Sequence, residues 1–246
     1  MDNVVLPEPL HGLLKGIERG AITNFYGAPG TGKTNICLLA AADCVRKGGK
    51  VIFIDTEGGF SLERLKQVAP RDYEQILKGM ELVEPKNLRE QTDAVRKVAQ
   101  SKPDLVPDLV ILDSSVALYR MECAEMKDAA GGKSRKCDSD SVMAANRELS
   151  KQLSLLSALA REKNMPVIIT THAFRSWDNG SYDIVGGDAI RYWSKSMVYL
   201  EKTGKTSERK ATIIKHRSLP EGGSVKFMLV QEGIKPSRGM LGLGRI

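Results

Sequence analysis

Four short runs of mostly apolar residues recur along the chain without the alternation of a half-exposed strand. They occupy residues 21–26, 51–55, 109–113 and 167–171. Runs of this kind are typical of parallel strands that helices cover on both faces. We therefore expect them to form the centre of a buried sheet.

The segments between these runs place apolar residues at helical spacing. This pattern predicts helices over 33–47, 62–68, 87–101 and 141–163. Asp140 is expected to cap the last of them. Near the end of the chain the pattern changes, and short turns with Gly or Pro separate three expected strands at 196–201, 209–215 and 224–230.

Strands that alternate with helices predict an α/β fold, a mostly parallel sheet with helices on both faces. The last three strands are expected to extend that sheet in an antiparallel direction. No linker or internal repeat divides the chain, so we expect one domain. It comprises an N-terminal segment over 1–20, a core over 21–235 and a flexible tail over 236–246.

Two stretches, 120–139 and 173–190, interrupt the pattern and are predicted to be long loops. The first carries Lys127, Lys133, Arg135 and Lys136, and the second carries Phe174, Arg175, Trp177 and Tyr182. Loops this long are uncommon unless they are functional or disordered. Basic side chains suit phosphates and aromatic rings suit stacked bases, so both stretches are candidates for binding single-stranded DNA. A solvated mobile loop and local aromatic packing are the alternatives.

Composition and charge narrow the possible functions. The chain has 246 residues and a formal net charge of +7, which favours an anionic partner. Its four cysteines form no Cys-x-x-Cys pair, so neither a zinc site nor a disulfide framework is expected. No stretch approaches the roughly 18 apolar residues of a membrane helix, and the first residues do not resemble a signal peptide. We expect a cytoplasmic protein without membrane association.

A glycine-rich segment between the first strand and the first helix fits the pattern Gly-x-x-x-x-Gly-Lys-Thr. It consists of Gly27, Ala28, Pro29, Gly30, Thr31, Gly32, Lys33 and Thr34. In this strand–loop–helix context, successive backbone N–H groups and the helix N-terminus bind phosphates. Lys33 is expected to reach the β- and γ-phosphates, and the Thr34 hydroxyl to bind Mg²⁺. The sequence therefore predicts a site for a nucleotide with Mg²⁺.

Two acidic residues complete the predicted site. Asp113 ends an apolar strand, where a carboxylate holds the Mg²⁺ shell in phosphate-loop enzymes. Glu57 follows the strand at 51–55 and is the candidate to orient or deprotonate the attacking water. A turn aspartate and a solvated loop glutamate are the alternatives.

These features resemble the RecA/RadA recombinase family over roughly residues 10–235. The resemblance rests on the phosphate loop, on Asp55-Thr56-Glu57-Gly58-Gly59-Phe60, on Leu112-Asp113-Ser114 with Ala117-Leu118-Tyr119-Arg120, and on Gly186-Gly187. It implies a RecA-like ATPase core that binds ATP with Mg²⁺, and it implies that Glu57 is catalytic and that Arg64 stacks on adenine. The two interruptions match the family's DNA-facing loops, and Lys215 and Arg217 match basic residues that face a neighbour's ATP. A solvated basic strand end is the alternative for that pair.

The chain departs from the family at one site residue. The family's γ-phosphate sensor is a glutamine, and His172 stands at that position. A histidine can still donate a hydrogen bond to phosphate, with a different reach and pH dependence. A histidine satisfied within the core is the alternative. We also expect the chain to lack the helical N-terminal domain of full recombinases, as shorter archaeal family members do.

The resemblance and the departure together favour an ATP-binding, DNA-binding accessory protein in homologous recombination and repair, with weak ATPase activity. Its expected partners are single-stranded or branched DNA and either a RadA-type recombinase or a junction resolvase. An oligomer is compatible with the sequence. A filament-forming, DNA-stimulated recombinase and a KaiC-like ATPase that acts on proteins are the alternatives.

Overall fold

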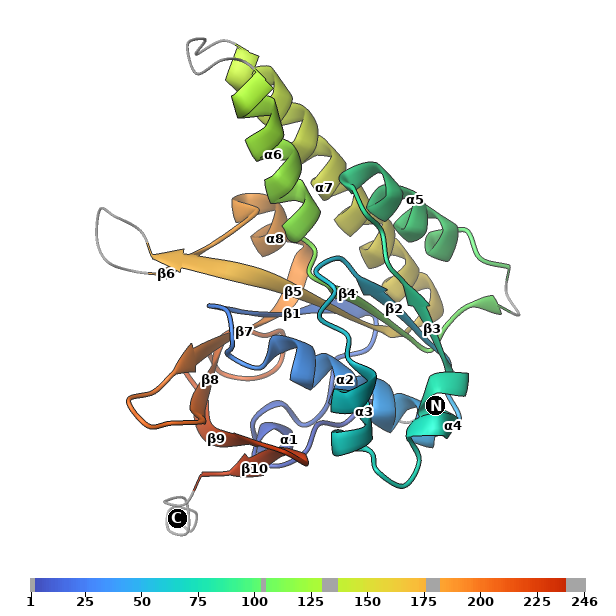
Figure 1. Cartoon of the computed structure of the whole chain (residues 1–246), viewed down its shortest axis with the longest axis vertical. Helices are drawn as coiled ribbons and strands as arrows, with labels where there is room; N and C mark the ends of the chain where they lie inside the picture. Colours follow the sequence, from blue (N-terminus) through green and yellow to red (C-terminus); the bar gives the residue numbers. More distant parts are fainter. Residues whose placement is uncertain (1–2, 103–104, 130–136, 176–181, 238–246) are drawn as a thin grey trace.

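A ten-stranded sheet forms the centre of the molecule. The computed structural model describes residues 3–102, 105–129, 137–175 and 182–237 (Figure 1). The strand order is β10-β9-β8-β7-β1-β5-β4-β2-β3, and β6 pairs with β5 outside this path. The strands are β1 (Ala21–Gly27), β2 (Val51–Asp55), β3 (Met80–Val83), β4 (Leu109–Asp113), β5 (Pro166–Arg175), β6 (Tyr182–Ile184), β7 (Ser194–Lys202), β8 (Glu208–Lys215), β9 (Ser224–Val230) and β10 (Gly233–Pro236).

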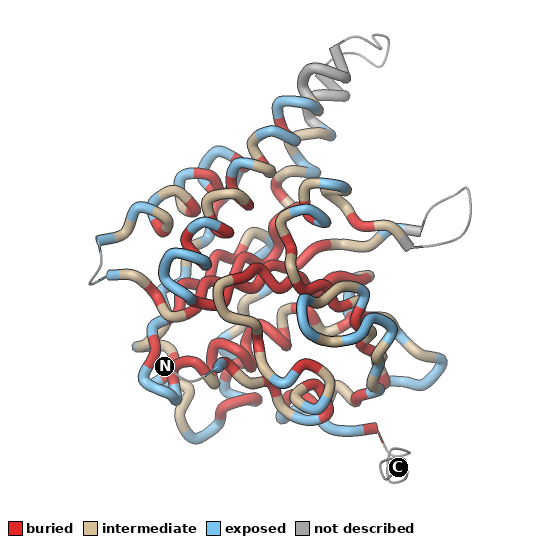
Figure 2. Tube along the Cα trace, turned by 180° about the vertical axis from the view of Figure 1, so that it is seen from behind, coloured by how far each residue is buried: buried red, intermediate tan, exposed pale blue. Residues whose placement is uncertain are grey.

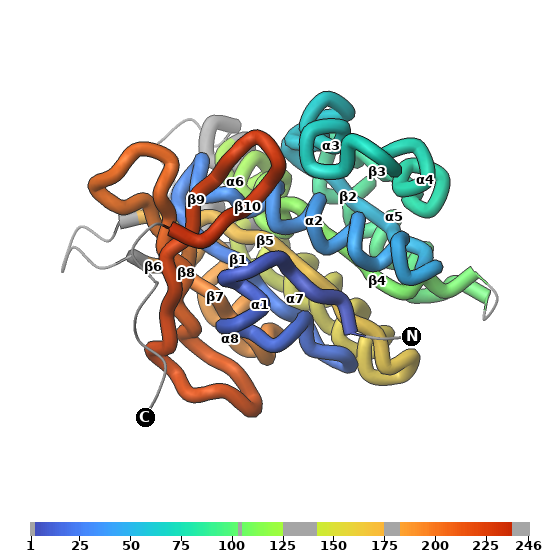
Figure 3. Tube along the Cα trace, turned by 90° about the horizontal axis from the view of Figure 1, so that it is seen from below, coloured from blue at the N-terminus to red at the C-terminus, as the bar shows by residue number. Residues whose placement is uncertain are grey.

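The direction of the strands changes across the sheet. β7, β1, β5, β4, β2 and β3 all pair in parallel. β8, β9 and β10 continue from β7 in antiparallel pairs, and they stand on the opposite side of the molecule from β3 (Figure 3). The predicted fold class is confirmed. Because the parallel strands share one direction, their carboxyl ends meet along one edge of the sheet, where ligands of such folds bind.

Helices cover both faces of the sheet (Figure 1). One face packs against α1 (Leu10–Leu14), α2 (Lys33–Arg46), α3 (Leu62–Val68) and α4 (Tyr73–Lys78). The other packs against α5 (Leu88–Ala99), α7 (Cys137–Lys163) and α8 (Gly187–Trp193). α6 (Ala117–Ala129) lies along α7, and the two helices extend together beyond the sheet. No helix within the described residues is long and apolar enough to cross a membrane.

The burial of the strands explains their apolar sequences. Every residue of β1, β2 and β4 is buried, and Figure 2 shows the buried segments gathered in the sheet. Strands covered on both faces exclude water from every side chain, so they need no polar alternation. The N-terminal segment belongs to the same core, because Val4, Leu6 and Leu10 are buried against α2 and the sheet.

Local sequence signals explain where the helices begin. The Ser61 hydroxyl accepts a hydrogen bond from the Arg64 backbone N–H at the start of α3. The Asn87 side chain does the same for Glu90 at the start of α5. Each bond satisfies one of the donors that a helix start leaves without an internal partner.

The prediction for the start of the long helix is wrong. α7 begins at Cys137, so Asp140 lies within the first turn and is not the N-cap. An acidic residue suits the first turn of a helix as well as its cap, because both positions face the positive end of the helix dipole. The sequence signal therefore marked the beginning of the helix only to within one turn.

The prediction of two long loops is also wrong for most of their residues. α6 continues to Ala129 and α7 begins at Cys137, although the sequence predicted a loop over 120–139. Ala, Glu, Met and Lys in the first half of that stretch are strong helix formers, and they outweigh the glycines that follow. In the second stretch, β5 continues to Arg175, β6 pairs with it, and α8 begins at Gly187.

Candidate nucleotide-binding site

The phosphate loop connects β1 to α2 at the carboxyl edge of the sheet, as predicted. A Cβ atom on Gly27 would lie 2.1 Å from the carbonyl oxygen of Leu200, so only glycine fits beside β7. Gly30 and Gly32 have φ angles of +74° and +100°, a conformation that side chains with a Cβ rarely adopt. The glycines of the motif are therefore required by the local backbone.

Free backbone donors and a lysine give this loop the groups that an anion would need. Gly32 is the N-cap of α2, and no side chain caps the helix there, so its first N–H groups remain available to an anion. The Lys33 ammonium donates to the carbonyl oxygens of Gly27 and Ala28 at 3.0 and 3.2 Å. Burial lowers the pKa of Lys33, and the charges of Asp113 and Glu57 oppose that shift.

Asp113 and Thr34 are the two residues predicted to hold Mg²⁺. Asp113 is buried at the end of β4, and its Oδ1 accepts a hydrogen bond from Thr170 at 2.5 Å. Its Oδ2 is buried without a hydrogen-bond partner among the described residues. Burial raises the pKa of Asp113, and the hydrogen bond from Thr170 opposes the shift. A bound cation would satisfy this oxygen, and Mg²⁺ prefers oxygen ligands.

Glu57 lies in a turn that Asp55 organises. The Asp55 carboxylate accepts hydrogen bonds from the backbone N–H groups of Glu57, Gly59 and Phe60. This turn lies over the phosphate loop, because a Cβ atom on Gly59 would be 3.4 Å from the Thr34 hydroxyl. This role of Asp55 is not among the sequence predictions. The signal was its place at the end of a buried strand, the same place that identified Asp113.

Glu57 contacts His172, the residue at the family's sensor position. His172 follows Thr171 in β5 and pairs in register with Gly27. Its Nε2 lies 2.5 Å from Oε1 of Glu57. The hydrogen bond from His172 lowers the pKa of Glu57, and the Lys33 charge lowers it further against the opposing effect of burial. The two residues predicted to act on the γ-phosphate thus bind each other in this structure.

The Arg64 guanidinium donates hydrogen bonds to oxygen atoms of the protein itself. Its Nε donates to Asn35 at the start of α2, and two further donors bind the carbonyl oxygens of Val230 and Gln231. These carbonyls belong to the last residue of β9 and to the turn that follows it. The predicted stacking of Arg64 on adenine stays a prediction, and the contacts seen here give this side chain a structural role as well.

Lys215 and Arg217 lie away from the phosphate loop of their own chain. β8 runs antiparallel to β7, so it begins beside the phosphate loop and ends at the opposite edge of the sheet. The Lys215 ammonium donates to the carbonyl oxygens of Arg191 and Ser194 at the end of α8. Arg217 pairs with Glu18 at 2.7 Å. A contact with a neighbouring chain's nucleotide stays a prediction.

Most of the predicted DNA-binding side chains fall outside the described residues. These are Lys127, Lys133, Arg135, Lys136, Arg175, Trp177 and Tyr182, of which Lys127, Arg175 and Tyr182 have a described backbone. Phe174 is described, lies on β5 and is 49% exposed. An exposed ring at this position is compatible with base stacking.

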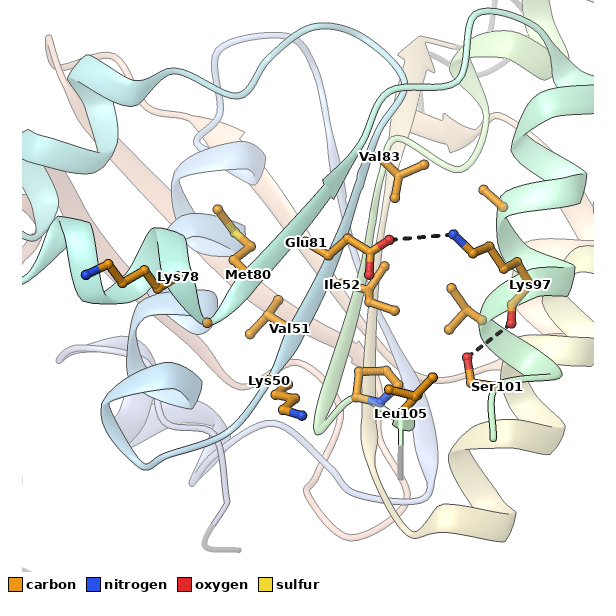
Figure 4. Close-up of a pocket in the computed structure, with 14 residues that line it drawn as sticks. Lys50, Val51, Ile52, Lys78, Met80, Glu81, Val83, Lys97, Ser101 and Leu105 are labelled. Carbon is orange, nitrogen blue, oxygen red and sulfur yellow. Dashed lines mark hydrogen bonds and ion pairs between the residues drawn. The ribbon is translucent and has the colours of Figure 1, made fainter. Parts of the chain in front are cut away.

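A separate cavity of about 480 Å³ lies between β2, β3 and α5 (Figure 4). Its walls include Ile52, Met80 and Val83, and the ammonium of Lys97 approaches Glu81 to 3.9 Å at its rim. None of its lining residues belongs to the phosphate loop. This cavity is therefore separate from the candidate nucleotide site, which is recognised by its backbone donors and charges.

Comparisons with known proteins show the family of the chain. The family model described as Rad51 matches residues 8–237. The DNA repair and recombination protein RadB of Methanobrevibacter smithii is 36% identical over 89% of each chain. RadB of Methanococcoides burtonii is 39% identical over 93% of this chain and 95% of the relative. A solved structure described as the RadB recombinase superposes with a TM-score of 0.74 and 30% identity, covering 94% of this chain and 97% of that one. The chain therefore belongs to the Rad51 family, among the RadB DNA repair and recombination proteins.

Proposed function

We propose that the protein binds ATP with Mg²⁺, binds DNA, and assists homologous recombination and repair as an accessory protein with weak ATPase activity. Single-stranded or branched DNA is the proposed nucleic-acid partner. A full RadA-type recombinase or a junction resolvase is the proposed protein partner. Membership of a DNA repair and recombination family supports the process, and the contact between Glu57 and His172 carries the proposal of weak hydrolysis.

The phosphate loop, Thr34 and Asp113 supply what the binding of ATP requires. The loop N–H groups and Lys33 would hold the phosphates, while Thr34 and Asp113 would hold the metal. When bound, Mg²⁺ would neutralise charge on the phosphate oxygens. Binding of this kind needs no contribution from Glu57, so it is separable from hydrolysis.

Hydrolysis would depend on the availability of Glu57. A carboxylate becomes a weaker base toward water when its pKa is lowered and when another group binds one of its two oxygens. In this chain Oε1 of Glu57 is engaged by His172, and that hydrogen bond lowers the pKa of Glu57. The same contact occupies the nitrogen with which His172 would sense the γ-phosphate. Both features favour slow turnover, with ATP acting chiefly as a bound ligand that orders nearby segments.

Steady-state ATP hydrolysis with and without saturating single-stranded DNA tests this proposal. DNA binding is confirmed in the same buffer, and Glu57→Gln serves as the control. We expect slow turnover that DNA changes less than about twofold and that Glu57→Gln lowers about a hundredfold. Strong stimulation by DNA would instead identify a recombinase motor. Absence of DNA binding would favour an ATPase that acts on proteins.

A histidine variant tests the physical reason for the slow turnover. His172→Gln restores the residue type that the family carries and removes the contact with Glu57. We expect DNA to stimulate this variant more than the wild-type protein. Equal stimulation of both proteins would contradict the role given to the Glu57–His172 contact.

A further inference from the structure

The hairpin formed by β7 and β8 brings two cations to the phosphate loop. β7 runs parallel to β1, with Leu200 in register with Gly27, so its carboxyl end reaches the loop. The ammonium nitrogen of Lys202 lies 3.3 Å from the position that a Cβ atom would have on Gly30. Arg209, which pairs with Lys202 in the ladder, donates its Nε to the carbonyl oxygen of Gly30 at 3.0 Å.

Arg209 has a partner among the described residues, and Lys202 has none there. Arg209 is bound to the carbonyl oxygens of Gly30 and Glu208. The Lys202 ammonium makes no ion pair or hydrogen bond within the part of the chain that the structure describes. Lys210 differs in this respect, because it pairs with Glu201 at 3.3 Å on the same hairpin. An exposed lysine without a partner, held against a phosphate loop, is a charge available to a ligand.

The surrounding charges point to a polyanionic ligand. Lys33 approaches the loop from α2, and Lys202 approaches it from the sheet. Burial is the main cause of the lowered pKa of Lys33, and the positive charge of Lys202 lowers it further. Like charges gathered around one loop repel each other unless an anion lies between them. A chain of phosphates carries enough negative charge to pair with both ammonium groups.

We propose that Lys202 is a second phosphate-binding lysine, which contacts the polyphosphate of the bound nucleoside triphosphate from the side opposite Lys33. Arg209 is a positioning residue that fixes Gly30 through its carbonyl oxygen. This assignment rests on the proposed function, because it concerns the same nucleotide. A lysine suits the role because its flexible stem carries a point charge that follows the phosphates.

Equilibrium binding of ATP with Mg²⁺ to the full chain, measured by calorimetry, tests the assignment. We expect Lys202→Ala to weaken binding about tenfold, the effect of one lost charge-assisted contact. Lys202→Arg should retain most of the affinity. Lys210→Ala removes the same charge from the same hairpin and should change Kd less than about twofold, because Glu201 already neutralises Lys210.

A salt series separates direct contact from a structural effect. The Kd of Lys202→Ala should rise less steeply with KCl than the wild-type Kd, because one charge contact is missing. Its melting temperature should equal that of the wild type, because Lys202 is exposed. A general distortion of the hairpin would lower the melting temperature and leave the salt dependence unchanged, which would contradict the assignment.

The remaining outcomes distinguish this inference from the proposed function. If Lys33→Ala abolishes ATP binding while Lys202→Ala binds ATP like the wild type, the role assigned to Lys202 is wrong. The proposed nucleotide site is then still supported. If Lys202→Ala and Lys210→Ala weaken ATP binding equally, the lower net charge of the protein causes the loss of affinity, and the role assigned to Lys202 is wrong. If the wild-type protein does not bind ATP, the proposed function itself is overturned.

Discussion

At the scale of single residues, Glu57, which we propose serves hydrolysis, also affects the stability of the fold. Its carboxylate is 37% exposed and accepts a hydrogen bond from His172, which lowers the pKa of Glu57. A carboxyl group whose pKa is lower in the folded protein than its ordinary value of 4.5 stabilises the fold when it is ionised. That contribution is complete above the ordinary pKa, and it is lost as the pH falls through the folded pKa.

Comparison of Glu57→Gln with the wild type isolates this contribution. At neutral pH we expect the variant to be less stable by at most about 1 kcal/mol, because the carboxylate is partly exposed and solvent screens the interaction. The difference should shrink as the pH falls below the ordinary carboxyl pKa and vanish below the lowered pKa of the folded protein. Urea unfolding over a series from about pH 7 to about pH 2 measures this decrease. A difference that persists at the lower pH would mean that ionisation of Glu57 is not its cause.

The residue types of the site could be predicted from the sequence, but their partners could not. Gly27, Lys33 and Thr34 occupy a continuous motif whose backbone requirements are local. The contact between Glu57 and His172 joins residues 115 positions apart, and the one between Thr170 and Asp113 spans 57 positions. No sequence pattern indicates a role for Lys202, because its place beside Gly30 follows from the register of β7 against β1.

At the scale of elements, burial decided which predictions succeeded. The strands at the centre of the sheet are apolar because both faces are covered, so their sequences identify them. β3 is an edge strand of four residues with none fully buried, and its sequence carries no comparable pattern. α6 was missed for another reason, because glycines beyond its end were given more weight than the helix formers within it.

Arg64 connects two elements that the sequence does not relate. Arg64 lies on α3, and its guanidinium donates hydrogen bonds to the carbonyl oxygens of Val230 and Gln231 where β9 ends. Asn35 accepts a hydrogen bond from Arg64 and donates one to the carbonyl oxygen of Gly233. The end of β9 packs close to the phosphate loop, because a Cβ atom on Gly32 would lie 3.0 Å from the Leu229 side chain. Arg64 therefore supports one wall of the proposed nucleotide site.

Removal of this guanidinium should destabilise the protein even without nucleotide. We expect Arg64→Ala to lower the free energy of unfolding by about 1–2 kcal/mol, because it breaks several hydrogen bonds to half-buried groups. Hydrogen exchange should accelerate at residues 230–233. Arg46→Ala, which removes a more exposed ion pair with Asp72, is the control and should cost less than about 1 kcal/mol. Unchanged stability of Arg64→Ala would mean that Arg64 serves the nucleotide alone.

At the scale of the whole molecule, the nucleotide site and the predicted DNA-binding segments share strands. α6 follows β4 soon after Asp113, and β6 pairs with the part of β5 that continues beyond His172. A shift of either strand end on nucleotide binding would therefore move the start of a predicted DNA-binding segment. This arrangement gives a physical route by which ATP would change DNA affinity.

The charges of the first predicted DNA-binding segment can be tested by their effect on salt dependence. Neutralising Lys133, Arg135 and Lys136 to Ala together should weaken binding to single-stranded DNA. If all three contact phosphates, the slope of log Kd against log salt should fall by about 2, because each contact with a single strand contributes roughly 0.7. Fluorescence anisotropy of a labelled oligonucleotide over a KCl series measures the slope.

The control variant for this experiment must remove the same charge elsewhere. Lys50, Lys78 and Lys97 surround the cavity beside β3, on the opposite side of the molecule from the antiparallel strands. Their replacement by Ala lowers the net charge equally, yet it should leave the slope almost unchanged, because counterion release depends on local contacts. Equal decreases of the slope in the two variants would mean that the total formal charge of +7 attracts DNA, and not one local group of charges. Only a decrease of the slope that is confined to the first variant would place the phosphate contacts on the segment between α6 and α7.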